Sequence, residues 1–187
     1  VSGIAAGCQQ AGVALLGGET AEHPGVMAAD EYDLAAAGTG VVEADQLRSA
    51  DRAQAGDVLV AMRSSGVHSN GYSLVRAALL DAASLRLTAH MDDLGRTLGE
   101  ELLEPTRIYT QDCLALCEQL GDDIRVFSHI TGGGIAANIA RVLPQDLHAD
   151  VDRSSWQPQP IFDLIARTGN VSASDMEQTF NLGLGMV

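Results

Sequence analysis

The 187 residues of the chain are 46% hydrophobic, which is enough for a folded core and argues against disorder, and no apolar run has the ~18 residues that a membrane-spanning helix needs. The formal net charge is −14 at pH 7, which disfavours a nucleic-acid backbone or an anionic membrane as partner but is compatible with a phosphorylated small molecule held by backbone N–H groups and Mg²⁺. All eleven basic residues are Arg, so neither Schiff-base chemistry nor a P-loop lysine is available within this chain.

Cysteine usage and the two chain ends indicate the compartment and the extent of the chain. Three cysteines, an odd number, are typical of a reducing compartment, and no signal peptide opens the chain, so we expect a cytoplasmic protein. Cys113 and Cys117 lie on one helical stripe with Tyr109 and are expected to face the core, because no further zinc ligands stand nearby. The chain begins without Met and ends within an alternating apolar stretch, so we expect it to be part of a longer protein.

Apolar periodicity, with glycine or proline stops, predicts helices and strands in alternation along the chain. Helices are expected at residues 3–11, 72–83, 109–120, 135–143 and 161–167, and strands at residues 13–16, 32–42, 58–62, 124–130 and 180–187. Residues 43–56 are polar and are expected to connect two domains, and residues 84–100 are weakly patterned. Strands that lead into glycine-rich loops and helices favour an α/β fold with mixed sheets.

The first of three candidate loops follows the strand expected at residues 13–16. Its members are Gly17, Gly18, Glu19, Thr20 and Glu22. The glycines let a ligand approach the backbone closely. The two carboxylates, three residues apart, could hold Mg²⁺ directly or through water, although a tight turn with solvated acids has the same pattern.

The second loop follows the strand expected at residues 58–62 and opens a helix. Its polar and small residues are Ser64, Ser65, Gly66, His68, Ser69 and Asn70. Free backbone N–H groups at a helix start favour a phosphate or carboxylate. His68 has an ordinary pKa near neutral pH and could therefore act as a general acid or base; the alternative is a surface histidine that caps the loop.

The third loop joins the strand expected at residues 124–130 to a helix. It contains His129, Thr131, Gly132, Gly133 and Gly134. Three consecutive glycines cost stability unless the backbone bends tightly or touches a ligand, so this loop predicts a phosphate cradle at the helix start. A flexible turn is the alternative. The histidine, at the end of the strand, is placed to face the same pocket.

The three loops and their flanking segments together resemble the phosphoribosylformylglycinamidine cyclo-ligase (AIR synthetase) family of purine biosynthesis. The matching segments follow the family's order over nearly the whole chain and are residues 17–25, 32–33, 38–43, 56–59, 64–76, 103–109, 129–134, 138, 141–144 and 180–181. One departure is His23, where the family usually has Met before the proline. The chain also lacks the family's N-terminal segment, with its lysine and acidic metal ligands, and the end of the last domain.

The resemblance implies two domains and a reaction. Residues 1–50 would be the end of an ATP-binding domain that forms a barrel across a homodimer, and residues 51–187 would be most of an α/β/α layered C-terminal domain. The implied reaction is the ATP-dependent closure of formylglycinamidine ribonucleotide to aminoimidazole ribonucleotide, with release of ADP and phosphate. We expect the fragment alone to be inactive.

The resemblance also implies a separate role for each of the three loops. The first loop would serve the nucleotide, with Glu19 as a ligand of Mg²⁺. His68, Ser69 and Asn70 would be the catalytic residues that face the reacting part of the substrate. The third loop, with Ser64, Ser65 and Gly66, would bind the phosphorylated substrate.

Two other functions stay open from the sequence. One is another ATP-using enzyme of the same superfamily, such as thiamin-monophosphate kinase, selenophosphate synthetase or formylglycinamidine ribonucleotide synthetase. The other is a non-catalytic nucleotide-binding or assembly module that keeps the fold without the chemistry. The residue strings at 17–22 and 68–76 favour the cyclo-ligase.

Overall fold

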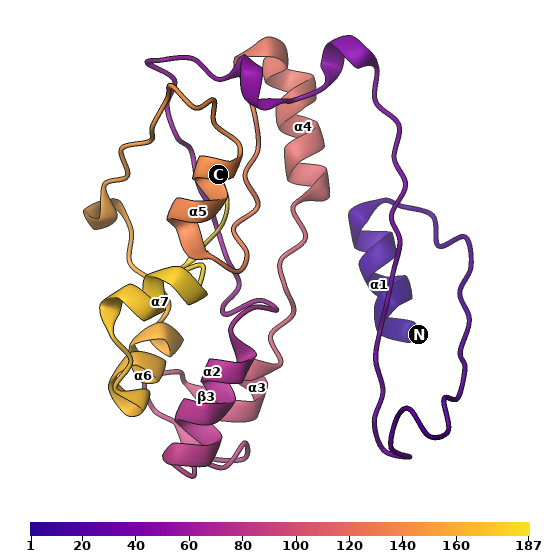
Figure 1. The fold of residues 1–187 in the computed structure, drawn as a ribbon, viewed down its shortest axis with the longest axis vertical. Coiled ribbons are helices and arrows are strands. Elements are labelled where there is room, and N and C mark those ends of the chain that lie inside the picture. Colours follow the sequence, from indigo (N-terminus) through magenta and orange to yellow (C-terminus); the bar gives the residue numbers. More distant parts are fainter. The chain divides into compact units, whose positions relative to one another are not determined.

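The computed structural model describes residues 1–187 and divides into two compact units, Val1–Leu47 and Arg48–Val187. Figure 1 shows the ribbon of both units, coloured along the sequence. The boundary lies within the polar connection expected at residues 43–56. No helix is long and apolar enough to cross a membrane.

The first unit contains one long helix and little other regular structure. Helix α1 (Ser2–Ala11) ends at Gly12, which takes the left-handed conformation with φ 71° and so stops the helix where the sequence predicts. A short 3-10 helix, η1 (Ala44–Gln46), lies near the end of the unit. No residue of this unit is buried, so none of its elements is held by a hydrophobic core of its own.

The strands expected at residues 13–16 and 32–42 are wrong for this structure. Both segments are non-helical and unpaired, and their apolar side chains are exposed, with Leu16 at 95% and Val41 at 99%. A strand forms only when its N–H and C=O groups pair with a neighbouring backbone. Within the first unit, the only bridge joins Pro24 to Met27.

The second unit contains six of the seven α-helices and all four strands. Its helical elements are η2 (Ala50–Arg52), α2 (Tyr72–Val75), η3 (Arg76–Ala82), α3 (Leu98–Leu102), α4 (Thr110–Leu120), η4 (Gly121–Asp123), α5 (Gly134–Arg141), η5 (Arg153–Ser155), α6 (Pro160–Gly169) and α7 (Ala173–Thr179). The helices expected at residues 109–120, 135–143 and 161–167 are thus confirmed. The helix expected at residues 72–83 is also present, but its second part, η3, is a π-helix.

The weakly patterned residues 84–100 fold into a hairpin and a helix that the sequence analysis missed. Strands β2 (His90–Met91) and β3 (Arg96–Thr97) pair antiparallel. Thr97 then caps α3: its hydroxyl accepts a hydrogen bond from the Glu100 N–H, and the Glu100 carboxylate accepts one from the Thr97 N–H. This capping box is readable in the sequence as Thr-Leu-Gly-Glu.

Strand β4 (Leu184–Met186) is hydrogen-bonded on both sides. On one side it pairs antiparallel with β1 (Met62–Arg63), and on the other side His129 forms an isolated bridge to Met186. The strand expected at residues 180–187 is therefore confirmed in part. The strand expected at residues 58–62 shrinks to its last residue, Met62, in β1. The one expected at residues 124–130 shrinks to the bridge at His129, with backbone hydrogen bonds of Ser128 to Val187 and of Ile130 to Gly185.

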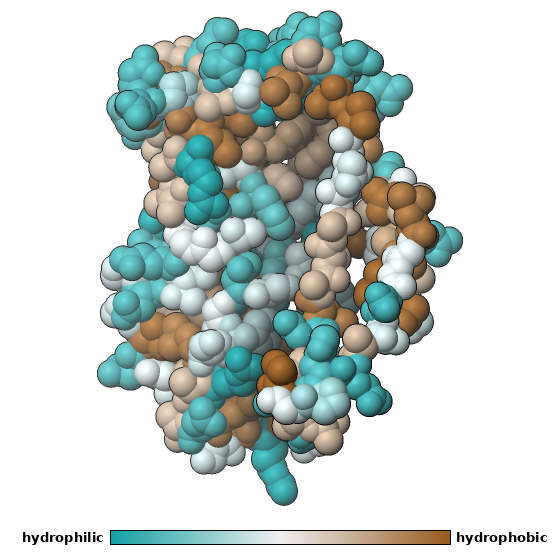
Figure 2. All heavy atoms as spheres, turned by 45° about the vertical axis from the view of Figure 1, so that its right-hand side comes forward, coloured by the Kyte–Doolittle hydropathy of each residue, from teal (hydrophilic) through white to brown (hydrophobic).

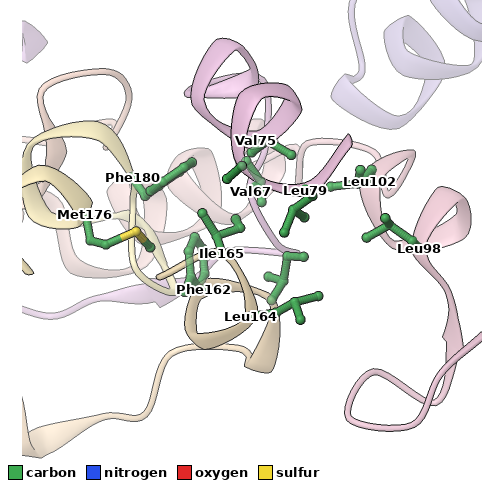
Figure 3. Packing of buried hydrophobic residues seen from close by; sticks show 12 residues of the cluster. Val67, Val75, Leu79, Leu98, Leu102, Phe162, Leu164, Ile165, Met176 and Phe180 are labelled. Carbon is green, nitrogen blue, oxygen red and sulfur yellow. The ribbon is translucent and has the colours of Figure 1, made fainter. Parts of the chain in front are cut away.

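The main core of the second unit lies where α2, η3, α3 and α6 come together (Figure 1). Helix α6 begins with Pro160 at its first turn and buries one amphipathic face, which includes Phe162 and Ile165. Figure 3 shows these two side chains pointing toward Val75, Leu79 and the other labelled members of the cluster. A smaller cluster consists of Ile130, Ile135, Ile139 and Leu184.

Large apolar side chains are also exposed on both units. In the second unit they include Val58 at 82%, Val60 at 74% and Leu114 at 58%. Figure 2 shows hydrophobic side chains interspersed with hydrophilic ones over the visible face.

Candidate functional site

The second loop, residues 64–71, is held at its start by a buried asparagine. Ser64 is buried, and its hydroxyl donates to Asn181 Oδ1 at 3.0 Å. Asn181, 2% exposed, donates through Nδ2 to the Gly66 carbonyl at 2.9 Å. The Ser64 N–H also donates to the Gly183 carbonyl at 2.9 Å. The loop is therefore fixed to the segment that leads into β4, although about 115 residues separate them.

The end of the loop depends on glycine. Gly71 has φ 78° and stands immediately before α2. A Cβ at this position would collide with the ring of Phe180, which is fully buried. Only glycine combines the left-handed backbone with this close approach.

His68 is buried within the loop rather than exposed to solvent, with 4% of its surface accessible and φ 61°. Its Nε2 accepts hydrogen bonds from the Ser65 N–H at 3.1 Å and the Arg107 N–H at 3.5 Å. Burial, and secondarily the neighbouring His129, lower the pKa of His68 to about 4. The expectation that His68 titrates near neutral pH is therefore wrong, and its catalytic role stays a prediction.

The loop lies beside residues 105–107. The Ser65 hydroxyl donates to the Pro105 carbonyl at 2.6 Å, and the hydroxyls of Ser69 and Thr106 are 3.0 Å apart. Ser69 is exposed and Asn70 half-buried, so both side chains remain accessible beside the buried imidazole.

The third loop is built around Asn138, a buried residue of α5. Asn138 Nδ2 donates to the Gly134 carbonyl at 2.7 Å and to the Thr131 carbonyl at 3.2 Å. Gly133 and Gly134 have positive φ values of 97° and 72°, and a Cβ at Gly134 would collide with the Glu177 carbonyl. Gly133 and Gly134 are thus required by the backbone geometry, whatever the loop binds.

The second and third loops meet within the second unit. A Cβ built at Gly132 would lie 3.6 Å from Asn70 Oδ1. Tyr109 lies near a histidine of each loop: its ring centroid is 6.2 Å from that of His68 and 6.2 Å from that of His129, whose side chain is exposed. The two loops therefore lie next to each other within the second unit.

Tyr109 is a site residue that the sequence analysis assigned to the core. It is buried, and its hydroxyl donates to the Arg63 carbonyl at 2.9 Å. Burial raises the pKa of Tyr109 to about 12, although the adjacent Arg107 acts in the opposite direction. Its ring packs against Gly185, where a Cβ would collide with the hydroxyl. The pairing of a tyrosine with a distant glycine leaves no signal in a single sequence.

The first loop lies in the first unit, and the structure does not gather metal ligands around it. Glu19 and Glu22 are exposed and belong to a segment without helix or strand. No group of three or more His, Cys, Asp or Glu side chains is arranged to hold a metal ion. The two carboxylates alone do not fit a complete Mg²⁺ site, so no step of a reaction is assigned to a metal here.

Comparisons with known proteins show the family of the chain. The family model of the AIR synthase related protein, C-terminal domain, matches residues 54–187. Proteins named phosphoribosylformylglycinamidine cyclo-ligase from Bacillus subtilis, Myxococcus xanthus and Alkaliphilus oremlandii are 47%, 50% and 46% identical over 187 residues. Each comparison covers all of this chain and 54% of the relative, so the chain spans about half the length of these curated relatives. The chain belongs to the family of AIR synthase related proteins, and residues 54–187 correspond to the C-terminal domain of that family.

Proposed function

We propose that this chain forms part of a phosphoribosylformylglycinamidine cyclo-ligase, which closes the ring of formylglycinamidine ribonucleotide with ATP and releases ADP and phosphate. The observation that carries the proposal is the meeting of the second and third loops at Asn70 and Gly132, in a chain that aligns from end to end with relatives of that name. Phosphoryl transfer depends mainly on positioning and charge neutralisation, which glycine loops and backbone N–H groups provide.

The proposed roles follow the accessibility of each group. Ser69 and Asn70 face the reacting part of the substrate, and the adjacent His68 is buried. Residues 131–134, with the exposed His129, hold the substrate phosphate. Ser64 is buried and bonded to Asn181, so it fixes the loop and does not contact a ligand.

The first loop completes the proposal on the nucleotide side. Residues 17–22 contribute glycines and the exposed Glu19 and Glu22 to the site for ATP and Mg²⁺. Bound ATP would supply the phosphoryl group that activates the formyl oxygen for attack by the amidine nitrogen. In this proposal residues 1–50 are the end of the ATP-binding domain, residues 51–187 are most of the second domain, and the protein acts as a cytoplasmic homodimer.

A chimera tests the function. Residues 1–187 replace the matching segment of the Bacillus subtilis relative, and ATP hydrolysis is measured with and without formylglycinamidine ribonucleotide, beside the unaltered relative. We expect substrate-dependent hydrolysis, with kcat/KM at least about 100-fold lower in Asn70→Ala, the scale for loss of one preorganised polar group at a reacting centre. Hydrolysis that does not depend on the substrate would overturn the function.

Carboxylate variants test the nucleotide side of the site. Glu19→Gln in the same chimera should lower substrate-dependent turnover, whereas Glu118→Gln, an exposed carboxylate on α4, should leave it unchanged. Equal turnover in Glu19→Gln, Asn70→Ala and the unsubstituted chimera would remove these site assignments while leaving the function in place.

A further inference from the structure

The hydrogen bonds of His68 fix its tautomer. A backbone N–H can only donate, so the ring nitrogen that accepts from Ser65 and Arg107 must carry a lone pair. The ring proton therefore sits on Nδ1. Nδ1 is buried and has no hydrogen-bond partner within the chain. A proton added at Nε2 would face two donors and break both bonds.

The surroundings of the imidazole also disfavour its charged form. The groups that face it are Tyr109, whose neutral ring packs at 6.2 Å, His129, and the segment of Arg107. Glu101 is the buried carboxylate on this side of the loop, with Oε1 3.8 Å from the Cβ position of Gly66, and it is paired with Arg96. None of these groups supplies an anion to the ring, so the neutral imidazole is the form that fits the structure.

The two bonds to Nε2 join parts of the chain that are far apart in sequence. Ser65 lies within the loop, three residues before the histidine, whereas Arg107 follows it by 39 residues. The contacts of Ser65 with Pro105 and of Ser69 with Thr106 join the same two segments. Of these side chains, the His68 imidazole is the one that accepts a hydrogen bond from a backbone N–H of each segment.

We propose that His68 is a positioning residue, whose neutral imidazole ties residues 64–71 to residues 105–107 through Nε2 and does not transfer a proton. By doing so it holds Ser69 and Asn70 at the surface. This inference rests on the proposed function only where turnover is measured. The two hydrogen bonds to Nε2 are a property of the folded chain and do not depend on that function.

Substitution by glutamine separates positioning from proton transfer. The Oε1 of glutamine can accept hydrogen bonds where Nε2 does, but it cannot act as a base near neutral pH. Hydrogen exchange of the Ser65 and Arg107 amides is measured in the 187-residue chain. We expect exchange about tenfold faster in His68→Ala and close to the unsubstituted rate in His68→Gln, since one lost hydrogen bond has about this effect. His148→Gln, an exposed histidine, is the control.

Nitrogen spectra of labelled histidine provide the spectroscopic readout. The signals that disappear in His68→Gln should be those of a neutral Nδ1–H imidazole and should stay unchanged from about pH 5.5 to 8, where an exposed histidine titrates. An imidazolium or an Nε2–H form for His68 in this range overturns the proposal. Amide exchange that is unaltered in His68→Ala, or equally fast in both variants, also overturns it.

Turnover of the chimera distinguishes this proposal from the proposed function. His68→Gln should keep most of the substrate-dependent hydrolysis, with an unaltered pH profile, while His68→Ala loses it. Loss in His68→Gln with normal amide exchange would show that the imidazole transfers a proton, which overturns the positioning role and leaves the function standing. An inactive unsubstituted chimera would remove the function without touching the exchange result.

Discussion

At Gly185 there is no room for a side chain, because two residues of the candidate site lie against it. A Cβ there would collide with the Tyr109 hydroxyl and would lie 2.8 Å from His68 Cε1. Both partners are buried and hydrogen-bonded, so neither can move without losing a bond. The glycine therefore sets the distance between β4 and the two rings.

Gly185→Ala should lower the free energy of unfolding by about 1–3 kcal/mol, the usual cost of overpacking a well-packed site. Gly132→Ala is the matched control, because its Cβ would make an ordinary contact at 3.6 Å with Asn70; we expect a change within about 0.5 kcal/mol. Urea unfolding of both variants measures the difference. A midpoint for Gly185→Ala equal to that of the unsubstituted chain would contradict the close packing.

The buried imidazole predicts a pH dependence of stability. The pKa of His68 is lowered from 6.5 to about 4 in the folded chain, so below pH 6.5 the unfolded chain binds a proton that the folded chain does not. Stability from this group is complete above pH 6.5 and falls as the pH decreases toward 4. Urea midpoints at several pH values should fall less steeply in His68→Gln than in the unsubstituted chain. Parallel curves would mean that the ring is accessible to protons.

At the residue scale, the sequence identified the polar loops but not how their groups are oriented. Glycine and serine runs at residues 64–71 and 131–134 predicted loops close to a helix start, which they are. The burial of His68 and the contacts of Tyr109 depend on β4, which is more than 70 residues away in sequence. No local pattern encodes such a contact.

Among the elements, α3 owes its start to the capping box of Thr97 and Glu100. Thr97→Ala should destabilise the second unit by about 1 kcal/mol, the typical cost of losing an N-cap, because the Glu100 N–H loses the hydroxyl that accepts its hydrogen bond. Thr88→Ala, at an exposed position before the hairpin, is the control. Thermal unfolding followed by circular dichroism measures both. An unchanged midpoint in Thr97→Ala would show that the packing of Leu98 and Leu102 is sufficient for this helix.

Helices were more predictable than strands, and hydrogen bonding explains the difference. The bonds of α4, α5 and α6 close within four residues, so local periodicity and caps are enough to predict them. The apolar segments at residues 13–16 and 58–61 have the composition of strands, but a strand also needs a neighbouring backbone, which local composition does not specify.

At the scale of the whole molecule, the two units differ in how they are held together. The first unit buries no residue, whereas the second has two apolar clusters. Opening of a segment is easiest where few apolar contacts are lost. Residues 13–43 should therefore be the least protected part of the chain.

Limited proteolysis with a glutamate-specific protease tests this difference. Glu19, Glu22, Glu31 and Glu43 are exposed and lie outside helices, whereas Glu118 is exposed but lies within α4. We expect the first cuts within residues 19–43, with a stable product that begins near Ala44, identified by mass spectrometry. Early cleavage after Glu118, with residues 1–47 intact, would contradict the assignment.

Strand β4 and the residue before it connect the two loops of the candidate site. The Ser64 N–H donates to the carbonyl of Gly183, immediately before the strand, and the Ile130 N–H donates to the carbonyl of Gly185 within it. The second and third loops are thus hydrogen-bonded to the same short segment of backbone, at two carbonyl groups that are two residues apart. A ligand that moves one loop also acts on the strand to which the other loop is hydrogen-bonded. We therefore expect the two loops to move together, and not independently, when a substrate binds.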